Sequence, residues 1–182
     1  MSPVPTNRRL VFAMAGSVLL KRSGQLADLR AMREAGGLYA VLDACDAPAV
    51  PILAEGLGAT RCVSLYRGDA EEVYADIAPY LVHVDTADLL DWITAYSTTE
   101  GWGILLSCAQ PLDVVRRHLR KFLRVLDPDG TPMYFRFYDP RVLARFLPTC
   151  TAAQLDELRG PLAWYATLSG EALTVFELRE SR

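Results

Sequence analysis

The amino-acid sequence predicts an α/β fold: a partly parallel sheet with helices on both faces, plus a small C-terminal helix and β-hairpin subdomain. Three observations lead to this prediction. From residue 38 onward, short apolar segments alternate with segments that begin with helix-capping residues. The segment 102–108 (WGILLSC) is apolar without alternation, which is typical of a strand buried on both faces. Near the C-terminus, two strand-like segments flank a Ser-Gly-Glu turn at 169–171, as in a hairpin.

The chain has 182 residues, of which 51% are hydrophobic, so it can bury one substantial core. We predict three regions: an N-terminal extension packed on the body (1–37), an α/β lobe (38–150) and a small C-terminal helix-hairpin lobe (151–182). The net charge of −3 argues against a dedicated nucleic-acid-binding protein, although a local basic face is compatible with it.

The N-terminal region contains an apolar run that resembles part of an export signal. Arg8 and Arg9 precede apolar residues at 10–15 and 18–20, as in a twin-arginine signal. Lys21-Arg22 follows the run without a small-x-small cleavage pattern, and the run is too short to span a bilayer. We therefore expect a buried helix or strand of the domain here, and a cytoplasmic protein with no membrane partner.

Periodicity and capping residues predict the other elements in order. We expect a loose tail at 1–7 and strands at 38–44, 61–66, 102–108, 132–138, 162–168 and 173–178, with a short strand or an extended edge at 79–84. Helices are expected at 26–35, 46–58, 69–77, 85–101, 111–124, 139–148 and 151–160. Helix starts are marked by Asp46, by Asp85 or Thr86, and by two capping boxes, Asp69 with Glu72 and Thr151 with Gln154.

The helix at 111–124 is amphipathic and strongly basic. Its apolar residues recur at intervals of three and four, which places Leu112, Val115, Leu119 and Phe122 on one stripe. The rest of its surface carries Arg116, Arg117, Arg120, Lys121 and Arg124. Two interpretations remain open, a solvated face or a face that contacts an acidic partner.

The segment 132–138 alternates as a strand does. Met133, Phe135 and Phe137 share a core-like face, and Tyr134, Arg136 and Tyr138 share the other, a pairing of phenols with a guanidinium that suits partner contacts. Asp139-Pro140 starts the next helix, on which Arg141 and Arg145 lie on one face. Asp139 is expected to pair with Arg141 or with Arg136.

The sequence shows little that is typical of an active site. The four cysteines are widely spaced, and neither His83 nor His118 has a partner at metal-ligand spacing. No glycine-rich phosphate loop or nucleophile elbow is present. We predict no catalytic residue, metal or cofactor, while a spatially assembled site such as Cys108 with His83 and Asp85 stays open.

Several segments together resemble a known family. They are LYAVLDA (38–44), SLYRGD (64–69), APYLVHVD (78–85), EGWGILLSC (100–108), LDVVRRHLRKFLRVLDPDG (112–130) and FRFYDPRVLARFLPT (135–149). Their order and spacing resemble the type VI secretion effector chaperones, or adaptors, long catalogued as a domain of unknown function. The resemblance implies a bacterial, cytoplasmic, non-enzymatic protein that binds a cognate toxic effector and helps load it on the VgrG or PAAR spike protein, with no nucleic acid or membrane as partner.

Two alternatives stand beside the adaptor hypothesis. A small cysteine-dependent α/β hydrolase or transferase requires a thiol beside His83 or His118. Nucleic-acid binding by the basic helix requires salt-dependent retention on DNA or RNA. As partner-binding residues we predict Arg116, Arg117, Arg120, Lys121, Arg124, Tyr134 and Arg145. As a structural motif at the strand–helix junction we predict Arg136, Tyr138, Asp139, Pro140 and Arg141.

Overall fold

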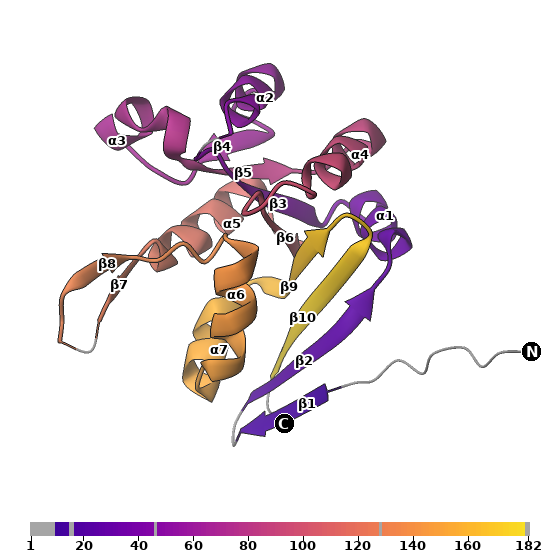
Figure 1. Ribbon diagram of the computed structural model, residues 1–182, viewed down its shortest axis with the longest axis vertical. Coiled ribbons are helices and arrows are strands. Elements are labelled where there is room, and N and C mark those ends of the chain that lie inside the picture. The colour runs from indigo at the N-terminus through magenta and orange to yellow at the C-terminus, as the bar shows by residue number, and fades with distance from the viewer. Residues whose placement is uncertain (1–9, 15–16, 46, 128, 181–182) are drawn as a thin grey trace, which may run out of the picture.

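The main sheet has eight strands in the order β1-β2-β10-β9-β6-β3-β5-β4 (Figure 1). The structure, a computed structural model, describes residues 10–14, 17–45, 47–127 and 129–180. The strands are β1 (Leu10–Met14), β2 (Ser17–Gly24), β3 (Leu38–Asp43), β4 (Cys62–Ser64), β5 (Pro79–His83), β6 (Gly103–Cys108), β9 (Leu162–Ser169) and β10 (Ala172–Glu180). The expected tail at 1–7 and the helix cap Asp46 lie outside the described residues.

The prediction of a partly parallel sheet is wrong, because all seven strand pairings of this sheet are antiparallel. β3 and β4 run in the same direction, but β5 lies between them and runs the opposite way. In the same manner, β3 separates β5 from β6. A helical connection lets two strands share a direction without making them neighbours, so alternating strands and helices did not require a parallel sheet.

Helices cover both faces of the sheet. Leu29, Val50 and Ile93 of α1 (Leu26–Glu34), α2 (Ala49–Leu57) and α4 (Ala87–Tyr96) belong to the core on one face. On the other face, the core contains Val115, Leu143 and Leu155 of α5 (Leu112–Leu119), α6 (Pro140–Phe146) and α7 (Ala152–Arg159). The central strands β3 and β6 are therefore buried along their whole length. This confirms that the segment WGILLSC is buried on both sides, although its neighbours are antiparallel.

The terminal segments extend this same sheet. β9 and β10 form the predicted hairpin, β9 pairs with β6, and β10 pairs with β2. The apolar run near the N-terminus contributes to β1 and β2, so it forms strands. All three predicted regions thus supply strands to one sheet, and their division into separate lobes stays a prediction. The indole of Trp102 donates to the carbonyl of Leu168 across 2.8 Å and ties the central strands to the hairpin.

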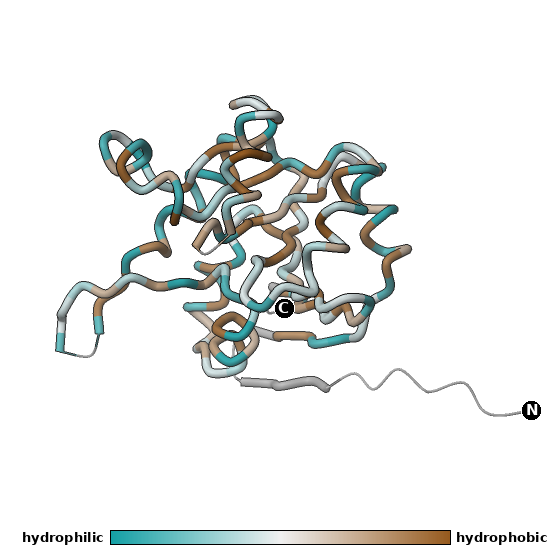
Figure 2. The backbone as a smooth tube through the Cα atoms, turned by 45° about the horizontal axis from the view of Figure 1, so that its top comes forward, coloured by the Kyte–Doolittle hydropathy of each residue, from teal (hydrophilic) through white to brown (hydrophobic). Residues whose placement is uncertain are grey.

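Two short strands, β7 (Arg124–Leu126) and β8 (Pro132–Tyr134), form a separate antiparallel ribbon that projects from the body (Figures 1 and 2). The predicted strand 132–138 is wrong in its length, because it ends at Tyr134. Phe137 and Tyr138 are adjacent and both are buried, which a strand with one core face does not allow. Met133, expected in the core, is 49% exposed.

The predicted helix signals have different outcomes. The amphipathic helix is confirmed as α5, which continues as the 3-10 turn η2 (Arg120–Phe122). Asp139 caps α6, and the capping box of Thr151 and Gln154 starts α7, as predicted. The capping box predicted at Asp69 is wrong: α3 (Asp69–Val73) has Gly68 at its N-cap and no side-chain cap. A 3-10 turn, η1 (Ala75–Ile77), and a second one, η3 (Leu147–Thr149), complete the helical segments described.

Candidate protein-binding surface

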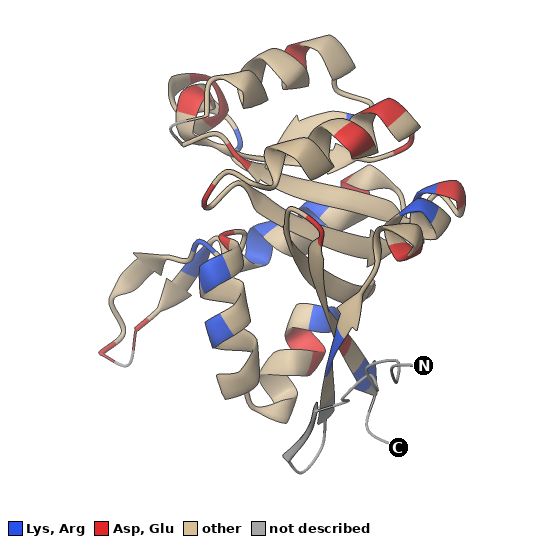
Figure 3. Cartoon of the chain, turned by 45° about the vertical axis from the view of Figure 1, so that its right-hand side comes forward, with Lys and Arg blue, Asp and Glu red and all other residues tan. Residues whose placement is uncertain are grey.

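Charge is unevenly distributed over the molecule. Figure 3 shows that Lys and Arg gather on α5, on α6 and near the base of the ribbon, whereas Asp and Glu dominate the helices around α2, α3 and α4. α5 buries Val115 and Leu119 against the sheet, so its charged residues face away from the core. The position of Arg116 and Arg117 in the last turn of α5 also suits the helix dipole.

Arg116 serves the fold as well as the charged surface. Its guanidinium donates to the carbonyl oxygens of Ser64 and Tyr66 at 2.8 and 2.9 Å, and to the carboxylate of Glu71 at 3.2 Å. These contacts fasten α5 to the segment between β4 and α3. Arg116 was predicted to bind a partner, but most of its hydrogen-bond donors already bind groups within the chain.

A cleft of about 410 Å³ lies beside this clamp. Its lining consists of Arg67, Asp113, Arg116, Arg117, Arg120 and Lys121, hereafter the basic cleft. The structure thus brings four of the predicted partner-binding residues together at one site. It adds Arg67, from the loop after β4, which is not among the residues predicted to bind a partner. Arg67 reaches the cleft because Arg116 fastens α5 to the loop that carries it. No local pattern in the sequence indicates that Arg67 lies beside the arginines of α5.

Positive charge in the basic cleft is only partly compensated. Arg117 pairs with Asp113 across 3.4 Å, and both side chains are at least 70% exposed, so this pair contributes little. The Nε of Arg120 is buried and has no hydrogen-bond partner among the described residues. Burial, together with repulsion from Arg67 and Arg116, lowers the pKa of Arg120. The cations of the cleft therefore destabilise one another when no anion is bound.

The ribbon forms an exposed wall next to the basic cleft. Tyr134 is 55% exposed and packs edge-on against Tyr66, with ring centroids 5.8 Å apart. Leu126 and Met133 are also exposed on the ribbon. Arg124 lies on β7 opposite Tyr134, and Arg145 is exposed on α6; neither lines the basic cleft. The predicted residues thus fall into a cleft, an adjoining ribbon, and one arginine elsewhere.

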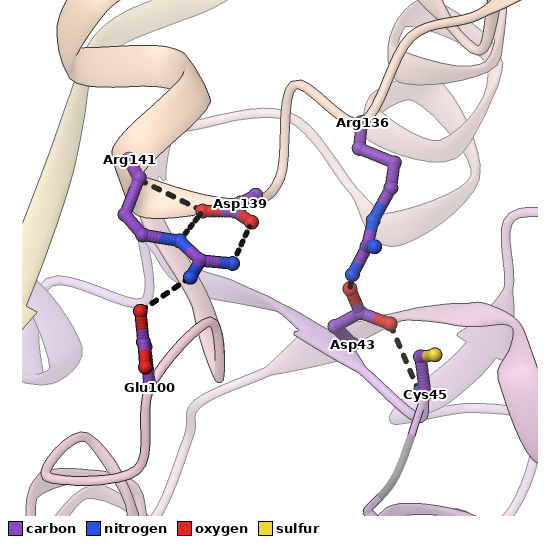
Figure 4. Close-up of polar contacts among 6 residues, drawn as sticks. All are labelled: Asp43, Cys45, Glu100, Arg136, Asp139 and Arg141. Carbon is purple, nitrogen blue, oxygen red and sulfur yellow. Dashed lines mark hydrogen bonds and ion pairs between the residues drawn. The ribbon is translucent and has the colours of Figure 1, made fainter.

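The residues predicted as a structural motif form two ion-paired contacts (Figure 4). Arg136 pairs with the buried carboxylate of Asp43 at the end of β3. Asp139 forms an ion pair with Arg141 at 2.6 Å, so its partner is Arg141 and not Arg136. Arg141 also forms an ion pair with Glu100. Burial would raise the pKa of Asp139, but the hydrogen bonds from the Arg141 guanidinium and backbone N–H outweigh it and lower that pKa. Tyr138 is buried, and Pro140 begins α6.

Three of the four cysteines, Cys62, Cys108 and Cys150, are buried, and Cys45 is exposed. Burial raises the pKa of Cys62 to about 12 and that of Cys150 to about 11, and it also raises the pKa of Cys108, whereas a nucleophilic cysteine needs a lowered pKa. His83 stacks on Tyr39 with its Nε2 near the Gly36 carbonyl. Across the part of the chain that is described, no three His, Cys, Asp or Glu side chains are grouped as metal ligands would be.

His118 is buried in the interface between α5 and α7. Its Nε2 lies 2.9 Å from the carbonyl oxygen of Leu158, which can only accept, so Nε2 carries the proton and donates. Burial lowers the pKa of His118. Gly160, with φ of +44°, packs so closely on the imidazole that an added Cβ would lie 2.2 Å from Cε1. This histidine therefore anchors α7 on α5.

A second depression lies on the opposite face of the sheet. It is a groove of about 520 Å³ between α2 and η1, lined by Ala44, Ala47, Pro48, Pro51, Ile52, Glu55, Asp76 and Ile77, hereafter the apolar groove. Ile52 is 70% exposed and Ile77 is 48% exposed, although both are large aliphatic residues. It shares no residue with the basic cleft.

Fold and surface together define an α/β protein with an antiparallel sheet, a basic cleft and an exposed ribbon. The family model described as Domain of unknown function (DUF4123) matches residues 38–157, and the chain belongs to this family. That match includes the basic cleft, the ribbon and the apolar groove. No match was found among curated proteins or among solved structures. Within the described residues, no helix combines the length and the apolar character needed to cross a membrane.

Proposed function

We propose that this protein is a type VI secretion adaptor: it binds a cognate toxic effector in the bacterial cytoplasm and helps load it on the VgrG or PAAR spike. The resemblance of six ordered segments within residues 38–149 supports this role. The observation that carries it is the position of the basic cleft directly beside the ribbon, since charge and exposed apolar groups meet there on one surface.

Such a surface suits protein recognition. Arginine and tyrosine are enriched at the centres of protein interfaces, and a positive patch speeds the encounter with an acidic partner. Tyr134 offers an exposed aromatic ring beside Tyr66 and is close enough to Arg120 to interact with its charge. The overall charge of −3 makes this patch a local feature that selects partners, not a general attraction for polyanions.

An adaptor must hold two partners, and a second surface is available for this purpose. The apolar groove lies over α2 and η1, on the other face of the sheet from α5. We propose that one of the two proteins, effector or spike, docks at the basic cleft and the other at the apolar groove. Exposed isoleucines such as Ile52 and Ile77 supply the apolar area for this second contact.

Export assays test the adaptor role. Deletion of the gene is expected to abolish secretion of the cognate effector by the native cell, while a second effector of the same secretion system is still exported as the control. Complementation with the wild-type gene should restore export. Unchanged secretion of every type VI effector in the deletion strain would refute the proposed function.

A further inference from the structure

We infer that the basic cleft binds a short, extended acidic segment of a protein, whose carboxylates enter between Arg67 and the arginines of α5. The inference deepens the proposed adaptor function and rests on it for the identity of the protein that supplies the segment. It is carried by the composition of the cleft, by the unpartnered donor of Arg120, and by the distribution of charge around the cleft.

The composition of the cleft favours an anionic occupant. Five of its six lining residues are cationic, and the single carboxylate, Asp113, is held only in an exposed pair with Arg117. Neither Arg67 nor Lys121 has a carboxylate within ion-pair distance among the described residues. An incoming carboxylate would therefore find free guanidinium and ammonium donors and would not have to displace a strong internal pair.

Among the described residues, Arg120 has a buried donor without a partner and a charge that its neighbours repel. Its Nε is buried without a hydrogen-bond partner in the described part of the chain, and Arg67 and Arg116 repel its charge. A buried donor without a partner destabilises the folded state. A carboxylate in the basic cleft would attract the Arg120 guanidinium and offset the repulsion among the three guanidinium groups.

The surroundings favour a peptide over a nucleic acid. The acidic first turn of α3, with Asp69, Glu71 and Glu72, lies beside the cleft, where Glu71 contacts Arg116. A phosphate backbone carries a charge on every nucleotide and would meet like charge there, whereas a peptide can place an uncharged residue at that position. On the ribbon side, Tyr134 is exposed and can contact the apolar side chains that a peptide carries between its carboxylates. A volume of about 410 Å³ accommodates a short segment and excludes a folded domain.

Fluorescence anisotropy with defined probes tests the inference. The probe is a fluorescein-labelled ten-residue peptide that alternates Glu and Ser; the comparison probes are a Lys-Ser peptide of equal length and a ten-nucleotide single-stranded DNA. We expect the Glu-Ser peptide to bind, to bind more tightly than the DNA, and to lose at least tenfold in affinity between 50 and 300 mM salt. The Lys-Ser peptide should not bind.

Variants locate the binding site. Arg117→Glu with Lys121→Glu changes two exposed residues of the cleft and should weaken Glu-Ser binding at least tenfold without lowering the unfolding temperature. The matched control is Arg30→Glu with Lys21→Glu, which reverses one exposed arginine and one exposed lysine outside the cleft and should change affinity less than twofold. Tighter binding of DNA, equal binding by both double variants, or no peptide binding would each overturn the inference.

The outcome is separable from that of the export assay. If the Glu-Ser peptide fails to bind while gene deletion abolishes effector export, the adaptor function stands and the acidic segment is refuted. If the peptide binds at the basic cleft but deletion leaves export unchanged, the adaptor function is refuted and the cleft is still an acidic-peptide site.

Discussion

The guanidinium of Arg136 is ion-paired with the carboxylate of Asp43, which lies 93 residues earlier in the chain and is 2% exposed. The pair fastens the segment after the ribbon to the end of β3 (Figure 4). We predict that Arg136→Ala lowers the free energy of unfolding by about 1–2 kcal/mol, because it leaves a buried carboxylate with fewer donors. Water can reach the site, since Arg136 itself is 46% exposed, and this limits the loss.

Urea denaturation measures this effect. Arg145→Ala, which removes an exposed arginine from α6, is the control and should change stability by less than about 0.5 kcal/mol. An equal loss in both variants would show that Arg136 acts only as surface charge. In that case the contact with Asp43 would have no part in holding the junction.

Arg116 and Arg117 are neighbours with different predicted roles. Arg116→Ala removes donors from the carbonyls of Ser64 and Tyr66 and should cost about 2 kcal/mol of stability. Arg117→Ala removes only an exposed pair with Asp113 and should cost less than about 0.5 kcal/mol. Thermal unfolding of both variants checks the prediction, and the reverse order of stability would contradict the clamp assigned to Arg116.

The buried imidazole of His118 predicts a pH dependence. Burial lowers its pKa in the folded state, whereas the unfolded chain binds a proton with a pKa of about 6.5. Below that pH the unfolded state therefore holds more protons, and stability falls as the pH drops, by at most about 1.4 kcal/mol per pH unit. His118→Gln does not titrate there and should flatten the decline between pH 7 and pH 5.5.

Urea unfolding at a series of pH values measures how the free energy of unfolding depends on pH. His83→Gln is the matched control, because it removes the other histidine, which stacks on Tyr39 and is less buried than His118. Asp139 and Glu177 do not contribute in this window, because their pKa values are lowered from about 4 and their stabilisation is lost only at more acidic pH. An identical slope for wild type and His118→Gln would contradict the account.

Two surfaces on opposite faces predict separable losses of binding. Ile52→Asp with Ile77→Ser places polar groups in the apolar groove and should abolish binding of one partner, effector or spike, while the other is retained. Arg117→Glu with Lys121→Glu in the basic cleft should show the opposite selectivity. Pull-downs with each purified partner measure this. Loss of both partners in both folded double variants would contradict two independent docking surfaces.

Much of the secondary structure could be predicted from local patterns. The caps at Asp139 and Thr151 and the amphipathic stripe of α5 involve residues within four positions of one another, so the sequence shows them directly. The order of strands could not be predicted this way. Whether β5 pairs with β3 depends on contacts between residues such as Tyr39 and His83, far apart in the chain. Once helices cover both faces of a sheet, its buried strands are apolar whether their neighbours are parallel or antiparallel.

The candidate site was likewise predictable where it depends on local spacing and not where it depends on tertiary packing. The arginines of α5 were recognisable because helical spacing sets them on the surface next to one another. Arg67 was missed because only tertiary packing brings it across to Arg116 and Arg120. The alternation of 132–138 also misled, since the chain leaves the ribbon after Tyr134 and then buries both Phe137 and Tyr138.

Affinity purification from the native cell tests the central claim most directly. The tagged protein would be isolated at physiological salt, and the proteins bound to it would be identified by mass spectrometry, beside an untagged strain. The adaptor account predicts a stable complex with one large toxic effector and with VgrG or a PAAR protein, and it predicts that Arg117→Glu with Lys121→Glu removes one of them. Recovery of neither an effector nor a spike protein would contradict it.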